Sequence, residues 1–136
     1  MNIVGDGDLL PSLKKEFSSN QIIFHGFKNN VDDYYRNNDI LISLSYTENC
    51  PLSIIDAMKW GLPIITTPVG GVPELVENSN NGFLVKNENE IETAIQYFID
   101  NNNYIDIMGR NSRMLYEEKF KSTITINTIK KTLKEI

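Results

Sequence analysis

The chain has 136 residues, about the length of one domain, and is 40% hydrophobic and 23% charged, as is ordinary for a globular protein. Its net charge of −5 argues against a dedicated nucleic-acid binder. The single cysteine excludes an internal disulfide framework, and no apolar run reaches the roughly 20 residues that span a membrane. Because the first residues also lack the pattern of a signal peptide, we expect a cytoplasmic protein.

Short apolar runs alternate with amphipathic segments along the chain. The runs predicted as strands are 2–5, 21–25, 39–45, 63–67 and 82–85. The segments predicted as helices are 9–17, 31–36, 51–60, 73–77, 88–102, 104–119 and 123–135. Strands separated by helices in this way form βαβ units and a mainly parallel sheet. The predicted fold class is therefore α/β, with a Rossmann-like parallel sheet and flanking helices.

Ligands of such sheets bind beyond the carboxyl ends of the strands. The segments expected at those ends are rich in glycine and polar residues: 5–7, 26–27, 45–52 and 67–71. The most informative of them leads into the helix that begins at Pro51. The free backbone amides of such a helix start attract anions, including phosphate.

Two carboxylates flank this helix start. Glu48 precedes it, and Asp56 follows eight residues later, near the middle of the helix. Such a pair suits a ligand with a phosphate between two hydroxyl-rich groups, and a nucleotide sugar is a ligand of that kind. The alternative is that both carboxylates are simply solvated.

The segment from Ser45 to Glu74 resembles the signature of glycosyltransferase family four, an E-x7-E motif followed by a glycine-rich turn. The usual pattern is Ser, then Glu-Gly-Phe-Gly-Leu, Glu-Ala-Met, Gly-Leu-Pro-Val-Ile and Gly-Gly-x-Pro-Glu. This chain has Ser at 45, followed by ENCPL at 48–52, DAM at 56–58, GLPII at 61–65 and GGVPE at 70–74. Similar flanking segments are IVGDG at 3–7, IIFHGF at 22–27 and NGFLV at 81–85.

This resemblance implies that residues 1–136 are part of the C-terminal, donor-binding half of a retaining enzyme of GT-B architecture, without the N-terminal acceptor domain. The implied activity moves a hexose or N-acetylhexosamine from a nucleotide-diphosphosugar, expected to be a UDP-sugar, to a glycan or lipid-linked acceptor. The expected setting is bacterial surface polysaccharide synthesis, of O-antigen or capsule. No metal ion or other cofactor is expected.

The resemblance also implies roles for individual residues. Glu48 matches the catalytic-site Glu that binds hydroxyls of the transferred sugar, without being assigned as a nucleophile. Asp56 takes the place of the second Glu, which binds the ribose, and the backbone between them meets the sugar and diphosphate. The turn after the second strand lies near the nucleobase. The full set of implied donor-binding residues is Gly5, Gly26, Phe27, Glu48, Asn49, Cys50, Pro51, Leu52 and Asp56.

The family also has a first strand, and an Arg and a Lys that hold the diphosphate, upstream of residues 3–7. In a Rossmann-like sheet of order 3-2-1-4-5-6, that first strand lies between the strands at 2–5 and 39–45. Without it these two strands could pair directly, borrow a strand from another copy, or leave exposed edges that promote self-association. We expect self-association, weak donor affinity and an inactive isolated chain.

Two other functions are open: a UDP-sugar 2-epimerase of the same architecture, which lacks the spacing of Glu48 and Asp56, and a non-catalytic nucleotide-sugar-binding module. We expect His25 to be a buried, hydrogen-bonded structural residue and Cys50 to be a buried apolar residue rather than a nucleophile. Glu74 either caps a short helix or reaches the donor. The tail after residue 109 is basic, which indicates a solvated helix face or peripheral contact with an anionic membrane.

Overall fold

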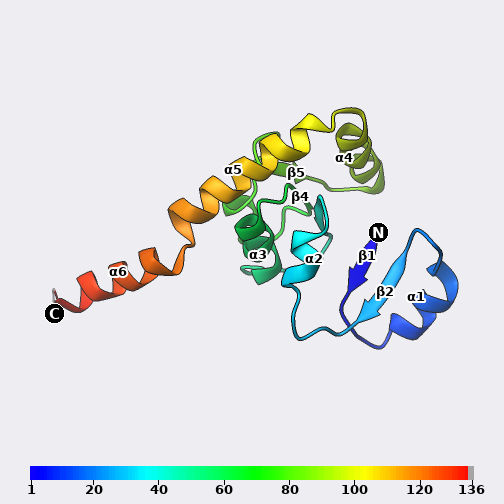
Figure 1. Cartoon of the computed structure of the whole chain (residues 1–136), viewed down its shortest axis with the longest axis horizontal. Helices are drawn as coiled ribbons and strands as arrows, with labels where there is room; N and C mark the ends of the chain where they lie inside the picture. The colour runs from blue at the N-terminus through cyan, green and yellow to red at the C-terminus, as the bar shows by residue number, and fades with distance from the viewer. Residues whose placement is uncertain (135–136) are drawn as a thin grey trace. The chain divides into compact units, whose positions relative to one another are not determined.

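The structure, a computed structural model, describes residues 1–134 and divides into two compact units, Met1–Asn37 and Asn38–Ile136 (Figure 1). Strands and helices alternate as far as Leu84, and the described residues after it form helices only. The strands are β1 (Asn2–Val4), β2 (Ile23–Gly26), β3 (Leu41–Ser43), β4 (Ile64–Thr66) and β5 (Gly82–Leu84). The α-helices are α1 (Leu10–Phe17), α2 (Asp32–Arg36), α3 (Leu52–Trp60), α4 (Glu88–Asp100), α5 (Asn103–Lys119) and α6 (Ser122–Lys134).

The first unit is a βαβ element followed by the short helix α2. β1 and β2 are parallel, with Asn2 opposite Ile23 and Ile3 opposite Phe24. Among residues 1–37, all of which the structure describes, Phe24 is the one buried hydrophobic side chain. No residue of α1 is buried. Because apolar burial is the main stabilising term in folding, this unit gains little stability by itself.

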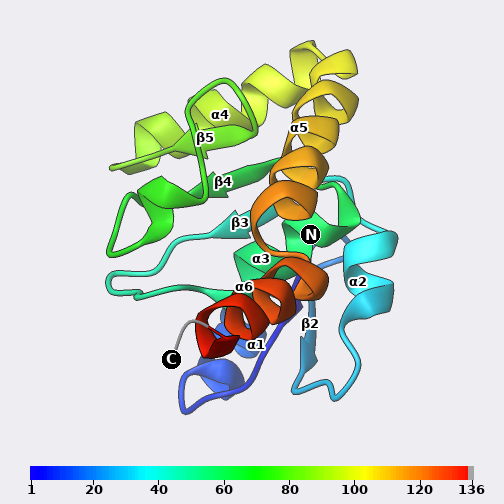
Figure 2. The same ribbon diagram turned by 90° about the vertical axis from the view of Figure 1, so that its left-hand side faces the viewer.

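The second unit is built on a three-stranded parallel sheet of order β3-β4-β5 (Figure 2). Ile64 lies opposite both Leu41 and Gly82, and Thr66 lies opposite both Ser43 and Leu84. All three residues of the central strand β4 are buried. A continuous run of apolar and β-branched residues is typical of a parallel strand covered on both faces.

Helix α3 packs closely against α5 through two glycines. α3 ends at Gly61, whose positive φ of 73° is the left-handed conformation that terminates many helices. A Cβ added at Gly109 of α5 would lie 2.2 Å from the Gly61 carbonyl oxygen, so the two backbones approach more closely than any side chain allows. This contact fixes the end of α3 and therefore the direction of the whole helix.

Helix α4 has a complete N-terminal cap. The Asn87 side chain accepts a hydrogen bond from the Glu90 amide at 3.0 Å and donates to the Glu90 carboxylate at 2.8 Å. The first of these bonds satisfies one of the backbone amides that a helix start leaves open, and the second holds the two side chains together. The apolar side of α4 then joins the core cluster that the sheet, α4 and α5 share: Ile65, Val85, Ala94, Phe98 and Met108.

Every strand and helix predicted from the sequence is present, and the α/β class with parallel strands and flanking helices is confirmed. The segment predicted as a helical turn at 73–77 is a 3₁₀ turn at Val72–Glu74. The strands are shorter than predicted; the third, expected at 39–45, is paired only over Leu41–Ser43. Strand ends are set by partners across the sheet, which an apolar run does not specify.

The described residues form two separate sheets. β1 pairs in parallel with β2 in one sheet, and β4 pairs in parallel with both β3 and β5 in the other. Over residues 1–134, no helix combines the length and apolar character needed to cross a bilayer.

The glycine contact between α3 and α5 predicts an unusual response to alanine. Gly109→Ala should lower the free energy of unfolding by about 1–3 kcal/mol, because the new methyl group meets a backbone oxygen that has no room to move. Alanine in a helix is otherwise more favourable than glycine by about 1 kcal/mol. Chemical denaturation followed by the fluorescence of Trp60 measures the change.

Arg110→Ala is the matched control, because Arg110 is the next residue of α5 and is exposed. It should change the free energy of unfolding by less than about 0.5 kcal/mol. A Gly109→Ala variant as stable as the wild type would contradict the close packing.

Candidate functional site

Two loops meet at the carboxyl edge of the sheet in the second unit. One follows β3 and leads into α3, and the other follows β4 and leads into the 3₁₀ turn. Thr67 of the second loop donates its hydroxyl hydrogen to the Ser45 carbonyl at 2.6 Å, and its amide donates to the Ser43 carbonyl at 3.3 Å. The Gly71 amide donates to the Asn49 carbonyl at 2.9 Å. Adjacent parallel strands thus place segments 43–49 and 67–71 side by side.

The glycine pair at 70–71 is what lets these loops approach. Gly70 has a φ of 53°, and a Cβ there would lie 1.7 Å from the Glu48 carbonyl oxygen. A Cβ at Gly71 would lie 2.4 Å from the Asn49 carbonyl oxygen. Both distances are far below any real contact, so only glycine fits at these two positions in this conformation.

Glu48 is half-buried in the loop after β3. Its Oε1 accepts a hydrogen bond from the Ser45 hydroxyl at 2.8 Å. Among the described residues no donor reaches the other carboxylate oxygen, Oε2. The carboxylate is therefore held at one oxygen and can accept hydrogen bonds from a ligand at the other.

The start of α3 lies directly after this loop and has no side-chain cap. Pro51 is the N-cap residue, with φ −70° and ψ 114°, and its carbonyl accepts the Ile54 amide at 3.1 Å. Proline has no side-chain acceptor, so the first backbone amides of the helix remain available to an anion. Leu52, the first residue of the helix, is 73% exposed.

Asp56 lies one turn further along α3 and is half-buried. Its neighbours Ile54, Ala57 and Met58 are fully buried and form the face of the helix that packs against the rest of the unit. No hydrogen bond or ion pair involves the Asp56 carboxylate among the described residues. The side chain is thus another acceptor without a protein partner on the same helix.

Three of the predicted site residues belong to the first unit. Gly5 and Gly26, at the carboxyl ends of β1 and β2, are joined by a hydrogen bond from the Gly5 amide to the Gly26 carbonyl at 3.0 Å. Gly26 has a φ of 68°, and the following Phe27 has 69% of its surface exposed. Within this unit the structure therefore brings together Gly5, Gly26 and Phe27 at one sheet edge.

Three further predictions concern single side chains. His25 donates from Nε2 to the Asn2 side-chain oxygen at 2.8 Å and contacts the Tyr34 ring edge-on, in agreement with a hydrogen-bonded structural role, but it is half-buried rather than buried. Cys50 is exposed, so its predicted burial is wrong, because it lies in the loop rather than on the packed face of α3. Glu74, at the end of the 3₁₀ turn, is also exposed.

The contact that Thr67 makes between the two loops was not predicted from the sequence. Its hydroxyl joins the two loops, yet in the sequence it is only the last residue of an apolar strand. Its position at the carboxyl end of that strand was the one available signal. No group of three or more His, Cys, Asp or Glu side chains that could hold a metal ion occurs within the described part of the chain.

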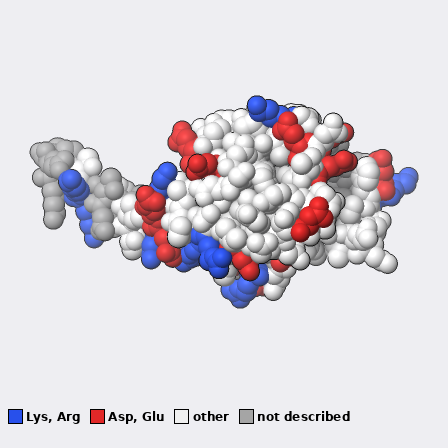
Figure 3. All heavy atoms as spheres, turned by 90° about the horizontal axis from the view of Figure 1, so that it is seen from above, with Lys and Arg blue, Asp and Glu red and all other residues white. Residues whose placement is uncertain are grey.

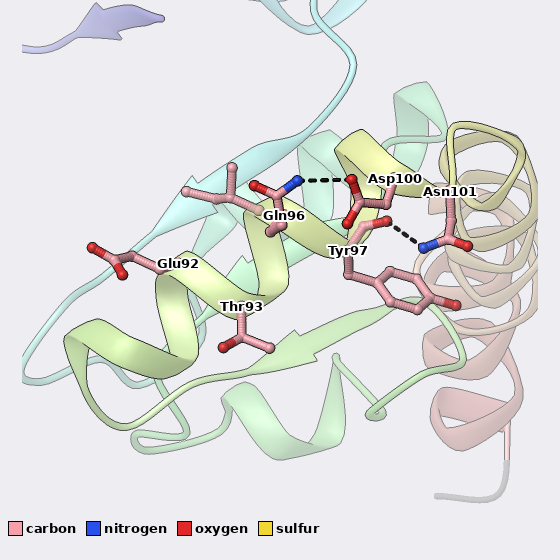
Figure 4. A pocket seen from close by; sticks show the side chains of 7 residues that line it. Glu92, Thr93, Gln96, Tyr97, Asp100 and Asn101 are labelled. Carbon is pink, nitrogen blue, oxygen red and sulfur yellow. Dashed lines mark hydrogen bonds between the residues drawn. The ribbon is translucent and has the colours of Figure 1, made fainter.

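An open hollow of the surface lies elsewhere, along α4 (Figure 4). It has a volume of about 670 Å³, and none of the predicted site residues lines it. Its polar side chains bond within the same segment, from Gln96 to Asp100 at 2.8 Å and from Asn101 to the Tyr97 carbonyl at 2.9 Å.

In the view of Figure 3, Lys and Arg side chains gather mainly toward the C-terminal helices.

Residues 1–101 match the family model described as Glycosyl transferases group 1. An O-antigen biosynthesis glycosyltransferase of Escherichia coli is 36% identical over 125 residues, which cover 90% of this chain and 36% of that protein. The UDP-Gal:alpha-D-GlcNAc-diphosphoundecaprenol alpha-1,3-galactosyltransferase of the same species is 28% identical over 135 residues, or 94% and 35%. The chain thus spans about a third of the length of these relatives.

Solved structures give the same result for the fold. Anabaena HepE in complex with UDP superposes with a TM-score of 0.84 at 22% identity, over 99% of this chain and 40% of that one. The C-terminal domain of a glycosyl transferase group 1 family protein from Francisella tularensis superposes with a TM-score of 0.69 at 27% identity, over 84% and 61%.

The fit of the Gly70–Gly71 pair under the Glu48 loop predicts that no side chain is tolerated at Gly70. Gly70→Ala should lower the free energy of unfolding by about 2–4 kcal/mol, from the left-handed φ and the collision together. Gly70→Asn separates the two causes, because asparagine tolerates a left-handed φ but still carries a Cβ. Denaturation followed by circular dichroism measures both variants.

If the collision dominates, asparagine should be nearly as damaging as alanine. If Gly70→Asn is as stable as the wild type, the predicted collision of a Cβ with the Glu48 carbonyl oxygen is wrong. The left-handed φ alone would then explain the effect of Gly70→Ala.

Proposed function

The chain belongs to the group 1 glycosyl transferases and has the fold of the C-terminal half of a GT-B enzyme, and from this premise we propose that it is the donor-binding domain of a retaining glycosyltransferase. The proposed donor is a UDP-sugar, and the acceptor is a glycan or a lipid-linked sugar. Two similar proteins support this choice, since one relative is a UDP-Gal transferase that acts on a diphosphoundecaprenol-linked sugar and HepE was solved with UDP. Because the chain spans about a third of its relatives, this activity is proposed for the whole protein.

The proposal rests on one observation: the Glu48 carboxylate, held by a hydrogen bond, lies in the loop directly before the start of α3, which has no side-chain cap. Glu48 offers one free oxygen to sugar hydroxyls. The open amides at the start of α3 and its dipole, equivalent to roughly half a positive charge, favour a diphosphate. A sugar joined to a diphosphate requires these two features side by side.

Asp56 suits the ribose at the other end of the donor. It lies four residues beyond Leu52, about 6 Å along the helix at 1.5 Å per residue. A diphosphate at the helix start separates sugar and ribose by a distance of this order. The aspartate arm is one methylene shorter than glutamate, so it reaches the ribose hydroxyls directly or through a water molecule.

The remaining assignments concern the base and the backbone. We assign Gly26 and Phe27 to the nucleobase, since an exposed aromatic ring offers a face on which a base can stack, and Gly5 to the adjoining turn. The backbone of residues 49–52 faces the sugar and diphosphate in this proposal. No metal ion or other cofactor takes part in it.

The proposed setting is the synthesis of a bacterial surface polysaccharide, at the cytoplasmic face of the membrane. The E. coli relative named for O-antigen biosynthesis supports the pathway. The basic residues toward the C-terminal helices would favour a surface of anionic lipids (Figure 3).

The two carboxylates should respond differently to truncation. In the full-length protein Glu48→Ala should lower turnover at least tenfold, because a hydrogen bond to a charged group is worth roughly 1.5–3 kcal/mol. Its affinity for free UDP should stay within about twofold, because UDP lacks the transferred sugar. Asp56→Ala should instead weaken UDP binding by about tenfold.

Steady-state kinetics and calorimetric titration with UDP measure these effects, and Asp100→Ala on the distant face of α4 is the control carboxylate. Equal losses of UDP affinity in the Glu48 and Asp56 variants would contradict the assigned roles.

A second prediction separates the transferase from a non-catalytic binding module. The 136-residue chain alone should bind UDP weakly and transfer no sugar, whereas the full-length protein should transfer it from the matching UDP-sugar. Titration and a product assay with both proteins test this. A full-length protein that binds donor but forms no product with any acceptor would favour the binding module.

A further inference from the structure

The Glu48 carboxylate is held by a chain of two hydrogen bonds that begins on a neighbouring strand. The Ser45 hydroxyl donates to Glu48 Oε1 at 2.8 Å, and the Ser45 carbonyl accepts from the Thr67 hydroxyl at 2.6 Å. Ser45 follows β3 and Thr67 follows β4, and these strands are paired in register. The carboxylate is thus tied through Ser45 to two rigid strands of the sheet.

The remainder of the loop is restrained from the opposite side. The Gly71 amide donates to the Asn49 carbonyl at 2.9 Å, and Gly70 lies so close to the Glu48 carbonyl that an added Cβ would be 1.7 Å from its oxygen. The Glu48–Asn49 backbone is thus packed against the Gly70–Gly71 turn. With the backbone restrained, the Ser45 hydroxyl becomes the group that selects the rotamer of the Glu48 side chain.

We propose that Ser45 is a positioning residue, which orients the Glu48 carboxylate so that Oε2 faces the donor sugar, and that Thr67 positions Ser45 in turn. This inference rests on the proposed role of Glu48. Neither hydroxyl touches the sugar, and both act through the carboxylate.

The physical reason is that an unrestrained glutamate side chain populates several rotamers. A glutamate side chain has three rotatable bonds, and fixing it is entropically unfavourable. The charge-assisted bond from Ser45 fixes it before the donor arrives, as preorganised active sites require. Loss of the hydroxyl leaves the carboxylate present but free to choose other rotamers. Turnover should therefore fall although every donor-binding group is retained.

The test compares Ser45→Ala, Ser45→Thr and Thr67→Val in the full-length protein. Ser45→Ala should lower kcat about tenfold, while the affinity for free UDP changes by less than about twofold. Ser45→Thr keeps the hydroxyl and should recover most of the lost turnover. Thr67→Val keeps the shape of the side chain, removes the outer bond and should lower kcat about threefold.

Thr93→Val is the matched control. The Thr93 hydroxyl also donates to a backbone carbonyl, that of Asn89 at 2.7 Å, but it lies on α4. This variant should leave kcat unchanged. Thermal unfolding of all variants identifies any loss of folded protein, and if Ser45→Ala is unfolded, the folded Thr67→Val and Ser45→Thr variants still test the chain of bonds.

A double mutant distinguishes positioning from a general structural effect. In the Glu48→Ala background there is no carboxylate to orient, so Ser45→Ala should change kcat by less than about twofold. If Ser45→Ala alone leaves kcat unchanged, or lowers it as much in that background as in the wild type, the positioning role is overturned while that of Glu48 stands. If Glu48→Ala itself leaves turnover intact, the proposed function of Glu48 fails, and the positioning role fails with it.

Discussion

The lack of a side chain at two consecutive positions is the constraint on which the candidate site depends. Gly70 and Gly71 allow the loop after β4 to lie against the carbonyls of Glu48 and Asn49 at distances that no Cβ could occupy. The pairing of β3 with β4 places Thr67 beside Ser45, and Ser45 holds the Glu48 carboxylate. The loop after β4 therefore contacts the Glu48 loop both at Ser45 and at the Glu48–Asn49 backbone.

Two other close backbone approaches in the second unit also depend on glycine. Gly109 allows α5 to approach the end of α3, and a Cβ at Gly82 would lie 2.0 Å from the Ile64 carbonyl oxygen, so β5 approaches β4 equally closely. The Gly109 contact fixes the end of α3, the helix that carries Asp56 and the open amides, against α5.

The start of α3 fits the proposed function. α3 begins at Pro51 without a side-chain acceptor, whereas the Asn87 side chain caps α4. A missing cap lowers stability by about 1 kcal/mol. α5 also lacks a side-chain cap, but α3 is the helix that begins directly after Glu48, where a diphosphate would itself satisfy the open amides.

The sequence by itself determined the order of strands and helices, the α/β class and the segment that carries the site, because apolar periodicity, the helix-ending Gly61 and the motif from Ser45 to Glu74 are local signals. It indicated that Glu48 and Asp56 matter but not how either is held. Only the tertiary structure decided that Thr67 bonds Ser45, that Gly70 underlies Glu48, and that Cys50 is exposed. These contacts join residues far apart in the chain, and they exist only once β3 and β4 are paired side by side. No local pattern of residues encodes such a distance, so the geometry of the site follows from packing rather than from the motif.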